Sequence, residues 1–222
     1  TQLALPPIPL HASTQMDNRT PEKVKFLAEA GFEQVVLARE LSIEQIRQIS
    51  QSTDVKLEAF IHGALCVSYS GVCYMSQNGC GRSANRGNCA QFCRLPYTLA
   101  DASGRILAKE KHLLSLKDLN LSNHLKELLD AGVSSLKIEG RLKDIPYVKN
   151  VTAYYRQALD KILDGKEYAP ASSGHCTYTF TPNTDKSFHR GSTNYFLHGR
   201  QRDIIQPDTP KSIGEKIGTA YS

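Results

Sequence analysis

Residues 34–63 read QVVLARELSIEQIRQISQSTDVKLEAFIHG, and this stretch decides the fold. The apolar runs 34–38 and 55–61 are rich in Val, Leu and Ile, a composition that favours strands. Between them, Ser42 and Gln45 have the spacing of a capping box, which predicts the start of a helix. A strand, a helix and a second strand in this order are typical of parallel βα units.

The same alternation continues on both sides of this stretch. Upstream, Thr20 followed by Pro21 predicts the cap and first position of a helix, and Gly31 ends it. About four βα units are visible, whereas a closed barrel needs eight. We therefore expect an α/β fold that is the C-terminal half of a (β/α) barrel, with further units outside this chain. An open doubly wound sheet is the alternative. The other expected elements are strands at 8–12 and 135–138, a helical turn at 113–119, and helices that begin at Ser122 and Asp144.

The chain divides by composition into two regions. Residues 1–165 hold the strand–helix alternation and form the expected partial barrel domain, which includes a cysteine-rich loop at 62–97. Residues 166–222 are rich in Gly, Pro and Asp, and here we expect a linker followed by a small β-rich or irregular extension. Within it, residues 176–180 read Cys-Thr-Tyr-Thr-Phe, an alternation that predicts a strand.

The composition is that of a soluble globular protein, with 40% hydrophobic and 22% charged residues among 222. No apolar run approaches the ~18 residues that span a membrane, and no secretory signal opens the chain, so we expect a cytoplasmic protein without a membrane partner. The net charge of +5 permits a nucleic-acid partner without requiring one. No Asp or Glu occurs from His62 to Tyr97, a stretch that contains Arg82, Arg86 and Arg94.

Polar side chains gather where the expected strands end. In parallel α/β folds these carboxyl ends converge on one face, where active sites lie. We therefore expect a pocket there, although any single residue could instead be a solvated loop residue or part of a structural ion pair. The pocket candidates are His11, Gln15, Arg39, Glu40, Glu58, His62, Glu139 and Arg141. The other histidines show no ligand spacing and are expected to be ordinary residues: His112, His124, His175, His189 and His198.

Five of the six cysteines lie in one 28-residue stretch, at positions 66, 73, 80, 89 and 93. Thiolates repel one another, so such a group indicates a bound metal or cluster, and nearby arginines favour the thiolate form. Structural zinc sites usually use two short cysteine knuckles, but only Cys89 and Cys93 are that close. The wide spacing favours an iron–sulfur cluster over zinc, with disulfides or free thiols as a third alternative. The compact three-cysteine motif of radical S-adenosylmethionine enzymes is absent.

Five short runs carry a resemblance to a known family. They are EAFIHGALC at 58–66, SGVC at 70–73, RSANRGNCAQFCR at 82–94, KIEGR at 137–141 and HASTQ at 11–15. Together these runs resemble the collagenase-like peptidase family 32, whose catalytic type is unknown. The resemblance covers most of residues 8–165.

The resemblance implies a fold, a cofactor and an activity. The family fold is an α/β barrel, and better-understood relatives carry a four-iron four-sulfur (4Fe-4S) cluster on cysteines. Those relatives hydroxylate RNA bases, in tRNA or large-subunit ribosomal RNA, without molecular oxygen and with prephenate as the implied oxygen source. Many other members are labelled proteases. Carried over to this chain, the resemblance leaves Cys80 as a spare thiol and makes the cluster ligands Cys66, Cys73, Cys89 and Cys93.

Three functions stay open on these grounds. An iron–sulfur RNA hydroxylase would need side chains for proton transfer and arginines for a dicarboxylate or phosphate. A protease would need a cysteine nucleophile with His62, because neither a Gly-x-Ser-x-Gly elbow nor a His-Glu-x-x-His helix occurs. The third is a metal-stabilised binding module, in which the cluster could be lost or replaced by zinc. Proton-transfer candidates are Glu58, His62 and Glu139, and substrate-binding candidates are His11, Gln15, Arg39, Arg82, Arg86 and Arg141.

Overall fold

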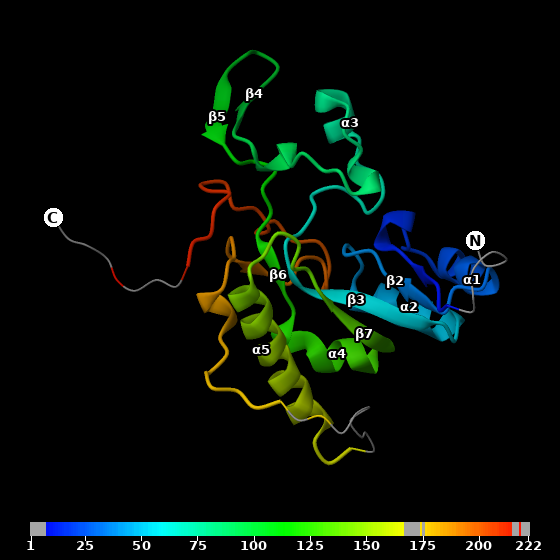
Figure 1. Ribbon diagram of the computed structural model, residues 1–222. Helices are drawn as coiled ribbons and strands as arrows, with labels where there is room; N and C mark the ends of the chain where they lie inside the picture. Colours follow the sequence, from blue (N-terminus) through cyan, green and yellow to red (C-terminus); the bar gives the residue numbers. More distant parts are fainter. Residues whose placement is uncertain (1–7, 167–173, 175, 215–217, 219–222) are drawn as a thin grey trace.

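The computed structural model describes residues 8–166, 174, 176–214 and 218. A six-stranded sheet lies at its centre (Figure 1). Four neighbouring strands are parallel, in the order β1 (His11–Ala12), β2 (Gln34–Val36), β3 (Lys56–Gly63) and β7 (Val133–Ile138). Two further strands extend the sheet: β6 (Asp118–Asn120), antiparallel to the end of β3, and β8 (Ser192–Thr193), parallel to β6. The parallel-dominated α/β sheet is as predicted, but among the described residues it does not close into a barrel.

The three longest helices begin at side-chain caps, as the sequence predicts. The side chain of Thr20 accepts a hydrogen bond from the backbone of Lys23, and Ser42 and Gln45 form a reciprocal capping box. Asp144 caps the last helix in the same way. The helices are α1 (Pro21–Glu29), α2 (Ile43–Ser52), α3 (Met75–Cys80), α4 (Leu125–Asp130) and α5 (Ile145–Leu163).

The core is formed where the apolar faces of these helices meet the sheet. Val24 and Leu27 of α1 and Ile49 of α2 are almost completely buried, together with Leu57 of β3. Full burial of one such side chain stabilises the fold by about 1.5–3 kcal/mol relative to exposure. The apolar positions spaced three and four residues apart in α1 and α2 therefore place these helices on the sheet.

Two predicted elements are wrong, and several elements were not predicted. The stretch 113–119, expected to be a helical turn, leads into strand β6. Residues 176–180, expected to be a strand, lie outside any regular element. The unpredicted elements include helix α3, strand β8 and a separate hairpin of β4 (Tyr97–Ala100) and β5 (Ile106–Lys111).

Long-range contacts explain why a strand, β6, forms at Asp118–Asn120. The buried carboxylate of Asp118 forms an ion pair of 3.1 Å with Arg190, and the backbone N–H of Asp118 donates to the carbonyl of Gly191. These partners lie more than 70 residues downstream, so no local pattern around Asp118 reveals them. The same contacts place part of the expected extension on the sheet, where Tyr195 and Leu197 are buried in the core.

The cysteine-rich loop leaves the sheet at the end of β3. In the view of Figure 1 this loop, with α3 and the β4–β5 hairpin, rises on one side of the sheet, and α4 and α5 lie on the other. The loop is mostly irregular, with short 3-10 turns at Ala84–Arg86 and Phe92–Arg94. Among the described residues, no helix combines the length and the hydropathy that crossing a membrane would require.

Candidate functional site

The carboxyl ends of three parallel strands meet, as predicted, at one edge of the sheet. Arg39, which follows β2, lies with its Nη2 atom 3.5 Å from the Oε2 atom of Glu139, which follows β7. The guanidinium of Arg39 also stacks over the Phe60 ring of β3, 3.9 Å from its centroid. At the end of β3, Gly63 has a φ of +103°, and a Cβ atom there would lie 2.4 Å from the Glu139 carbonyl oxygen. Only glycine therefore allows this approach of β3 and β7.

The cysteine-rich loop is tied to these strand ends by hydrogen bonds. The Glu40 carboxylate accepts from the backbone N–H (3.1 Å) and the hydroxyl (3.2 Å) of Ser70. At the far end of the loop, Arg94 donates to the carbonyl of Leu65 (2.9 Å), to the carbonyl of Leu116 (2.8 Å) and to the Ser115 hydroxyl (2.8 Å). Arg94 therefore holds the start and the end of the loop together. Its position in the acid-free stretch was visible in the sequence, but this clamping role was not.

Four of the loop's thiols share one electrostatic environment. Desolvation raises the pKa of Cys66, Arg39 opposes this rise, and the neighbouring thiols of Cys73 and Cys89 add to it. Desolvation likewise raises the pKa of Cys93, and the charges of Cys66, Cys89 and Cys73 act in the same direction. The thiols of Cys66 and Cys93 therefore both lie within electrostatic reach of Cys73 and Cys89. Cys80 is not among the principal contributors to either pKa.

The thiols of Cys80 and Cys89 have different hydrogen-bond partners. The Cys80 thiol donates to the Ser76 carbonyl at 3.3 Å, within its own helix. The Cys89 sulfur instead accepts from the backbone N–H of Gln91 at 3.3 Å. Arg82 further orders this part of the loop, because it donates to the Cys89 carbonyl at 3.0 Å.

The described cysteine sulfurs do not form a closed set of zinc ligands in this structure. With a Zn–S distance of about 2.3 Å, the sulfurs of a tetrahedral site lie about 4 Å apart. Among the residues that the structure describes, the one group of three or more potential ligand atoms within 4.8 Å is formed by His124, Glu127 and His198. No three cysteine sulfurs of the described residues are that close. All six cysteines are free thiols, so the expectation of disulfides finds no support.

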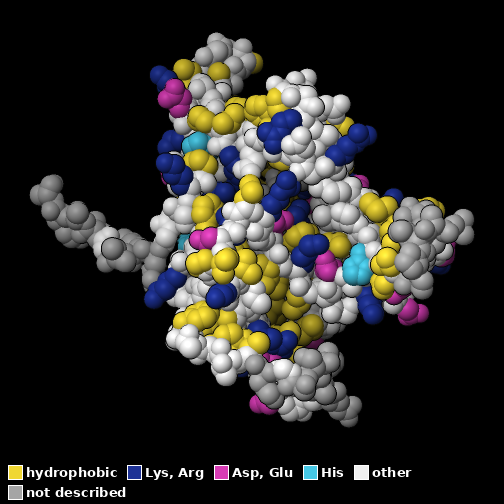
Figure 2. Space-filling model, in the orientation of Figure 1, with side chains coloured by type: hydrophobic (Ala, Val, Ile, Leu, Met, Phe, Trp, Pro, Cys, Tyr) yellow, Lys and Arg dark blue, Asp and Glu magenta, His cyan; other side chains and the backbone are white. Residues whose placement is uncertain are grey.

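The remaining predicted arginines lie on the surface. Figure 2 shows several Lys and Arg side chains over the cysteine-rich loop and in the hollow beneath it. Arg86 and Arg141 are exposed, and neither side chain forms an ion pair with the described residues. His11 and Gln15 are exposed as well; the backbone carbonyl of Gln15 lies against Gly71 of the loop.

Two of the predicted proton-transfer residues are engaged in structural contacts. Glu58 forms an ion pair of 3.1 Å with Lys137 and accepts hydrogen bonds from Gln34 (2.6 Å) and Ser135 (2.9 Å). His62 is 4% exposed, and its Nδ1 atom lies 3.2 Å from the Tyr155 hydroxyl. Desolvation lowers the pKa of His62 to about 4, so the imidazole is neutral at neutral pH.

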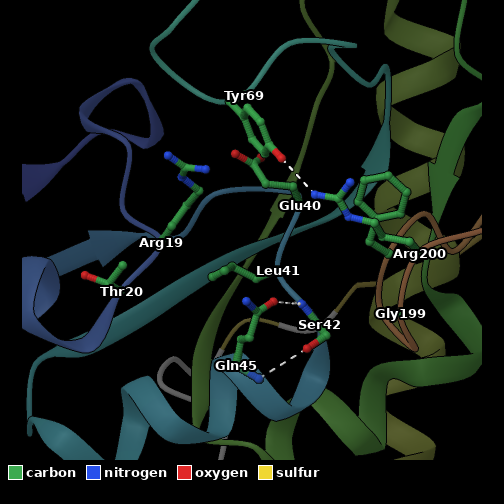
Figure 3. A pocket seen from close by; sticks show the side chains of 10 residues that line it. Arg19, Thr20, Glu40, Leu41, Ser42, Gln45, Tyr69, Gly199 and Arg200 are labelled. Carbon is green, nitrogen blue, oxygen red and sulfur yellow. Dashed lines mark hydrogen bonds between the residues drawn. The ribbon is translucent and has the colours of Figure 1, made fainter.

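A cavity of about 480 Å³ lies beside the loop, at the ends of β1 and β2 (Figure 3). Tyr69 forms one wall, with the Arg19 guanidinium 4.5 Å from its ring centroid. Arg200 donates a hydrogen bond of 2.9 Å to the Tyr69 hydroxyl. An aromatic ring between two arginines can accept a planar, anionic ligand. The sequence analysis missed these residues, because Arg200 joins Arg19 and Tyr69 only through the fold.

The profile of peptidase family U32 matches residues 1–207 of the chain. The chain belongs to this family. The resemblance read from the cysteine-rich loop is thereby confirmed, and relatives within the family carry different names. The chain is 59% identical over 218 residues to a 23S rRNA 5-hydroxycytidine C2501 synthase of Escherichia coli. The matched region covers 98% of this chain and 33% of that protein.

Two further relatives show the range of names in the family. A tRNA hydroxylation protein P1 of Bacillus subtilis is 40% identical, covering 70% of this chain and 38% of that protein. A collagenase of Porphyromonas gingivalis is 38% identical, covering 71% and 41% respectively. The chain thus spans about a third to two fifths of the length of these relatives. No solved structure matches the chain.

Proposed function

We propose that this chain is part of a cytoplasmic enzyme that hydroxylates an RNA base, in ribosomal RNA or tRNA, with the help of a 4Fe-4S cluster. The observation that carries the proposal is the attachment of the cysteine-rich loop to the strand ends, through Glu40 at Ser70 and through Arg94 at Leu65. Relatives named for 23S rRNA and tRNA hydroxylation support it. The proposed cluster ligands are Cys66, Cys73, Cys89 and Cys93.

The donor set of the loop fits an iron–sulfur cluster. Four cysteine thiolates are the usual ligands of such a cluster, and the wide spacing of these four in the sequence differs from the two short knuckles of a structural zinc site. The N–H of Gln91 that points at the Cys89 sulfur is the kind of hydrogen bond that tunes a cluster. When bound, the cluster would supply Lewis-acid or redox chemistry at the strand ends.

The chain's own residues would position the reactants. Arg39 pairs with the Glu139 carboxylate, and its charge also acts on the Cys66 thiol, so Arg39 links the strand ends with the proposed cluster site. Its Nε atom is buried and has no hydrogen-bond partner among the described residues, which leaves it free to bind an anion. Glu139 is partly exposed and is the best placed of the predicted proton-transfer residues. Glu58 and His62 would serve mainly to hold the strands in place.

Replacing C–H by C–OH on a base removes two electrons, so the compound that donates the oxygen atom must also accept these two electrons and be reduced. We propose a small dicarboxylate similar to prephenate as this donor, because exposed arginines without ion-pair partners surround the loop. Arg pairs well with carboxylates and phosphates alike. The arginines concerned are Arg82, Arg86 and Arg141, and His11 and Gln15 lie at the neighbouring end of β1.

The RNA would enter along the face that carries the loop and the cavity. Tyr69 offers a ring for a base to stack on, and Arg19 and Arg200 offer charge for the phosphates. We also propose that residues 1–165 are half of a barrel completed by strands elsewhere in the full-length protein, with residues 166–222 as an extension. The length of the relatives leaves room for those strands.

Neither alternative function is favoured by a specific contact. Among the described residues, no cysteine sulfur is hydrogen-bonded to a histidine, and His62 is buried against Tyr155. A cysteine protease needs such a pair. A metal-stabilised binding module would use the same thiols without the arginines.

The test uses full-length protein and a matched pair of cysteine variants. Protein purified without air should contain iron and acid-labile sulfide, with zinc below one equivalent. In cells, Cys66→Ala should abolish hydroxylation of the RNA base, measured by mass spectrometry, whereas Cys80→Ala in the same loop should leave it unchanged. Zinc without iron, or normal hydroxylation with Cys66→Ala, would overturn the proposal; cleavage of casein or gelatin by metal-free protein would favour the protease instead.

A further inference from the structure

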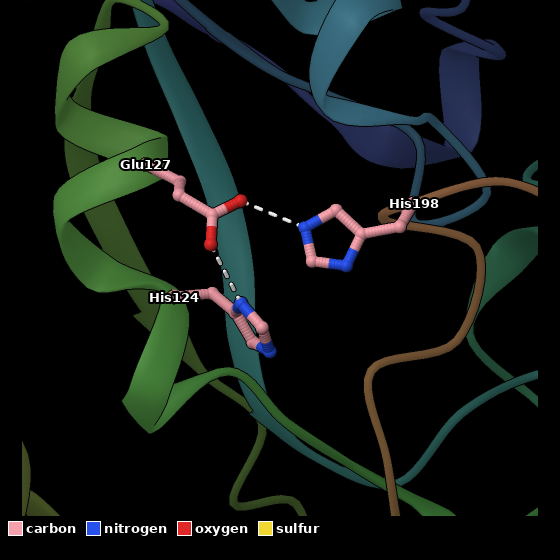
Figure 4. A group of neighbouring side chains, drawn as sticks. All are labelled: His124, Glu127 and His198. Carbon is pink, nitrogen blue, oxygen red and sulfur yellow. Dashed lines mark hydrogen bonds and ion pairs between the residues drawn. The ribbon is translucent and has the colours of Figure 1, made fainter.

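His124, Glu127 and His198 meet on the surface, although His198 is more than 70 residues away in sequence (Figure 4). The Nδ1 atom of His124 lies 3.0 Å from one carboxylate oxygen of Glu127. The Nε2 atom of His198 lies 2.7 Å from the other oxygen. The spacing of these histidines in the sequence predicted no ligand role, and the expectation that they are ordinary residues needs revision.

We propose that His124, Glu127 and His198 bind one divalent transition-metal ion, such as Zn²⁺, separately from the cysteines. Imidazole nitrogens and a carboxylate oxygen are ligands that zinc prefers. With metal–ligand distances of about 2.1 Å, the ligand atoms of a tetrahedral site lie about 3.4 Å apart. The observed nitrogen–oxygen distances are slightly shorter, so small side-chain rotations would admit the ion. Three protein ligands leave a fourth position for water.

The local structure arranges these ligands from two parts of the chain. His124 ends a 3-10 turn at Ser122–His124, and α4 follows directly, so His124 and Glu127 lie three residues apart on one face. His198 comes from the segment after β8. The side chains of His124, Glu127 and His198 are 23%, 45% and 46% exposed, so an ion can reach them from solvent.

The charge of the group also suits a cation. The two carboxylate oxygens of Glu127 each face one imidazole nitrogen, of His124 and of His198. The imidazole rings meet edge to face, with centroids 4.9 Å apart, which leaves both ligating nitrogens turned toward Glu127. A carboxylate between two imidazole rings gives the group one anionic and two nitrogen ligands for a divalent ion.

A second layer of contacts holds His198 in place. The Nδ2 atom of Asn194 lies 3.4 Å from the outer ring nitrogen of His198, and Gln201 donates to the Asn194 side-chain oxygen at 2.5 Å. Metal-ligating histidines are usually oriented by a polar contact of this kind at the other ring nitrogen. Asn194 is therefore expected to be a positioning residue of the site.

The ion would join α4 to the wall of the cavity. Phe196, Gly199 and Arg200 line the cavity and flank His198 in sequence. A metal bound to His198 and to α4 would restrict the movement of this wall, and would stabilise the folded state because the unfolded chain does not bring the ligands together. The inference concerns binding of the ion alone and does not depend on the proposed RNA chemistry.

The experiment measures zinc bound by the purified chain, with Zn²⁺ alone as the probe. Because the thiols also bind zinc, the readout is the difference between variants that share all six cysteines. Glu127→Gln and His198→Ala should each bind one equivalent fewer than the unmodified chain, and His11→Ala, which removes an exposed histidine elsewhere, should bind the same number. Glu127→Gln nearly preserves the shape of the side chain, so loss of folding does not confuse the result.

Two further readouts belong to the same experiment. Zinc should raise the melting temperature of the unmodified chain by more than that of Glu127→Gln. Asn194→Ala should lower the affinity of this site for Zn²⁺ about tenfold without abolishing binding, as expected for a positioning residue. Equal zinc content in the unmodified chain and in both ligand variants, together with equal thermal shifts, would overturn the proposal.

Discussion

The guanidinium of Arg39 lies 3.5 Å from the Glu139 carboxylate and joins the end of β2 to the end of β7 across β3. The same guanidinium stacks on Phe60, so its position depends on both charge and planarity. The side chains of Arg39 and Glu139 are largely covered, with exposed fractions of 14% and 27%. This contact therefore organises the strand ends on which the proposed active site is built.

Replacement of Arg39 should lower the free energy of unfolding more than replacement of an exposed arginine of the same region. Arg39→Ala leaves Glu139 partly covered without its cation and should lower the free energy of unfolding by about 1–2 kcal/mol. Arg86→Ala, an exposed side chain, should change it by less than about 0.5 kcal/mol. Urea unfolding of both variants measures the difference, and equal values would show that the Arg39–Glu139 contact contributes nothing.

Gly63→Ala should be strongly destabilising, because an added Cβ atom would meet the Glu139 carbonyl oxygen at 2.4 Å. The backbone of Gly63 also has a positive φ, which costs about 1 kcal/mol for alanine. Gly104 in the β4–β5 hairpin has a positive φ but open space around it, so Gly104→Ala isolates the backbone cost. We expect Gly63→Ala to lose about 2–4 kcal/mol and Gly104→Ala about 1 kcal/mol. Similar losses would mean that β3 and β7 can separate freely.

The stability of the chain should fall as the pH is lowered through the range set by His62. Its pKa is lowered from 6.5 to about 4 in the folded state, so the unfolded state binds a proton first as the pH drops. The contribution of His62 to the free energy of unfolding is therefore present above pH 6.5 and is lost progressively down to about pH 4. At 1.36 kcal/mol per pKa unit, the loss reaches about 3 kcal/mol.

Unfolding curves recorded between pH 4 and 7 measure how the free energy of unfolding changes with pH. His62→Gln removes the titrating group and should flatten the decline in this window, whereas His11→Gln, at an exposed position, should not. An unchanged slope in His62→Gln would show that other groups cause the pH dependence.

Local signals in the sequence were sufficient for most of the fold. The caps at Thr20, Ser42 and Asp144 and the apolar runs beside them act over a few residues, so the helices and parallel strands could be predicted. Strand β6 could not, because Asp118 depends on Arg190 and Gly191. Whether a parallel sheet closes depends on strands beyond the visible units, so the sheet of the described residues is open and the expected half of a barrel stays a prediction.

The candidate site was predictable where it follows from strand direction. Arg39 and Glu139 follow parallel strands on either side of β3, so the sequence could place them at the same edge of the sheet, although not in contact. The engagement of Glu58 with Lys137 and of His62 with Tyr155 depends on cross-strand and helix packing, which the sequence does not display. For the same reason the cavity at Tyr69 and the group at Glu127 were missed. The assignments of the four cysteine ligands stay predictions until metal analysis tests them.

Tyr69 should contribute to binding of single-stranded RNA, because its ring lies between Arg19 and Arg200 at the cavity. Stacking of a base on an aromatic ring is worth about 1–3 kcal/mol, so Tyr69→Ala should weaken RNA binding about five- to 150-fold. Tyr74, an exposed tyrosine of the same loop outside the cavity lining, provides the matched control, and Tyr74→Ala should bind normally. Fluorescence anisotropy with a labelled oligoribonucleotide measures both affinities at one salt concentration, since phosphate contacts depend on salt. Equal weakening by the two variants would place the RNA elsewhere on the loop, and no weakening by Tyr69→Ala would remove the cavity from the RNA path.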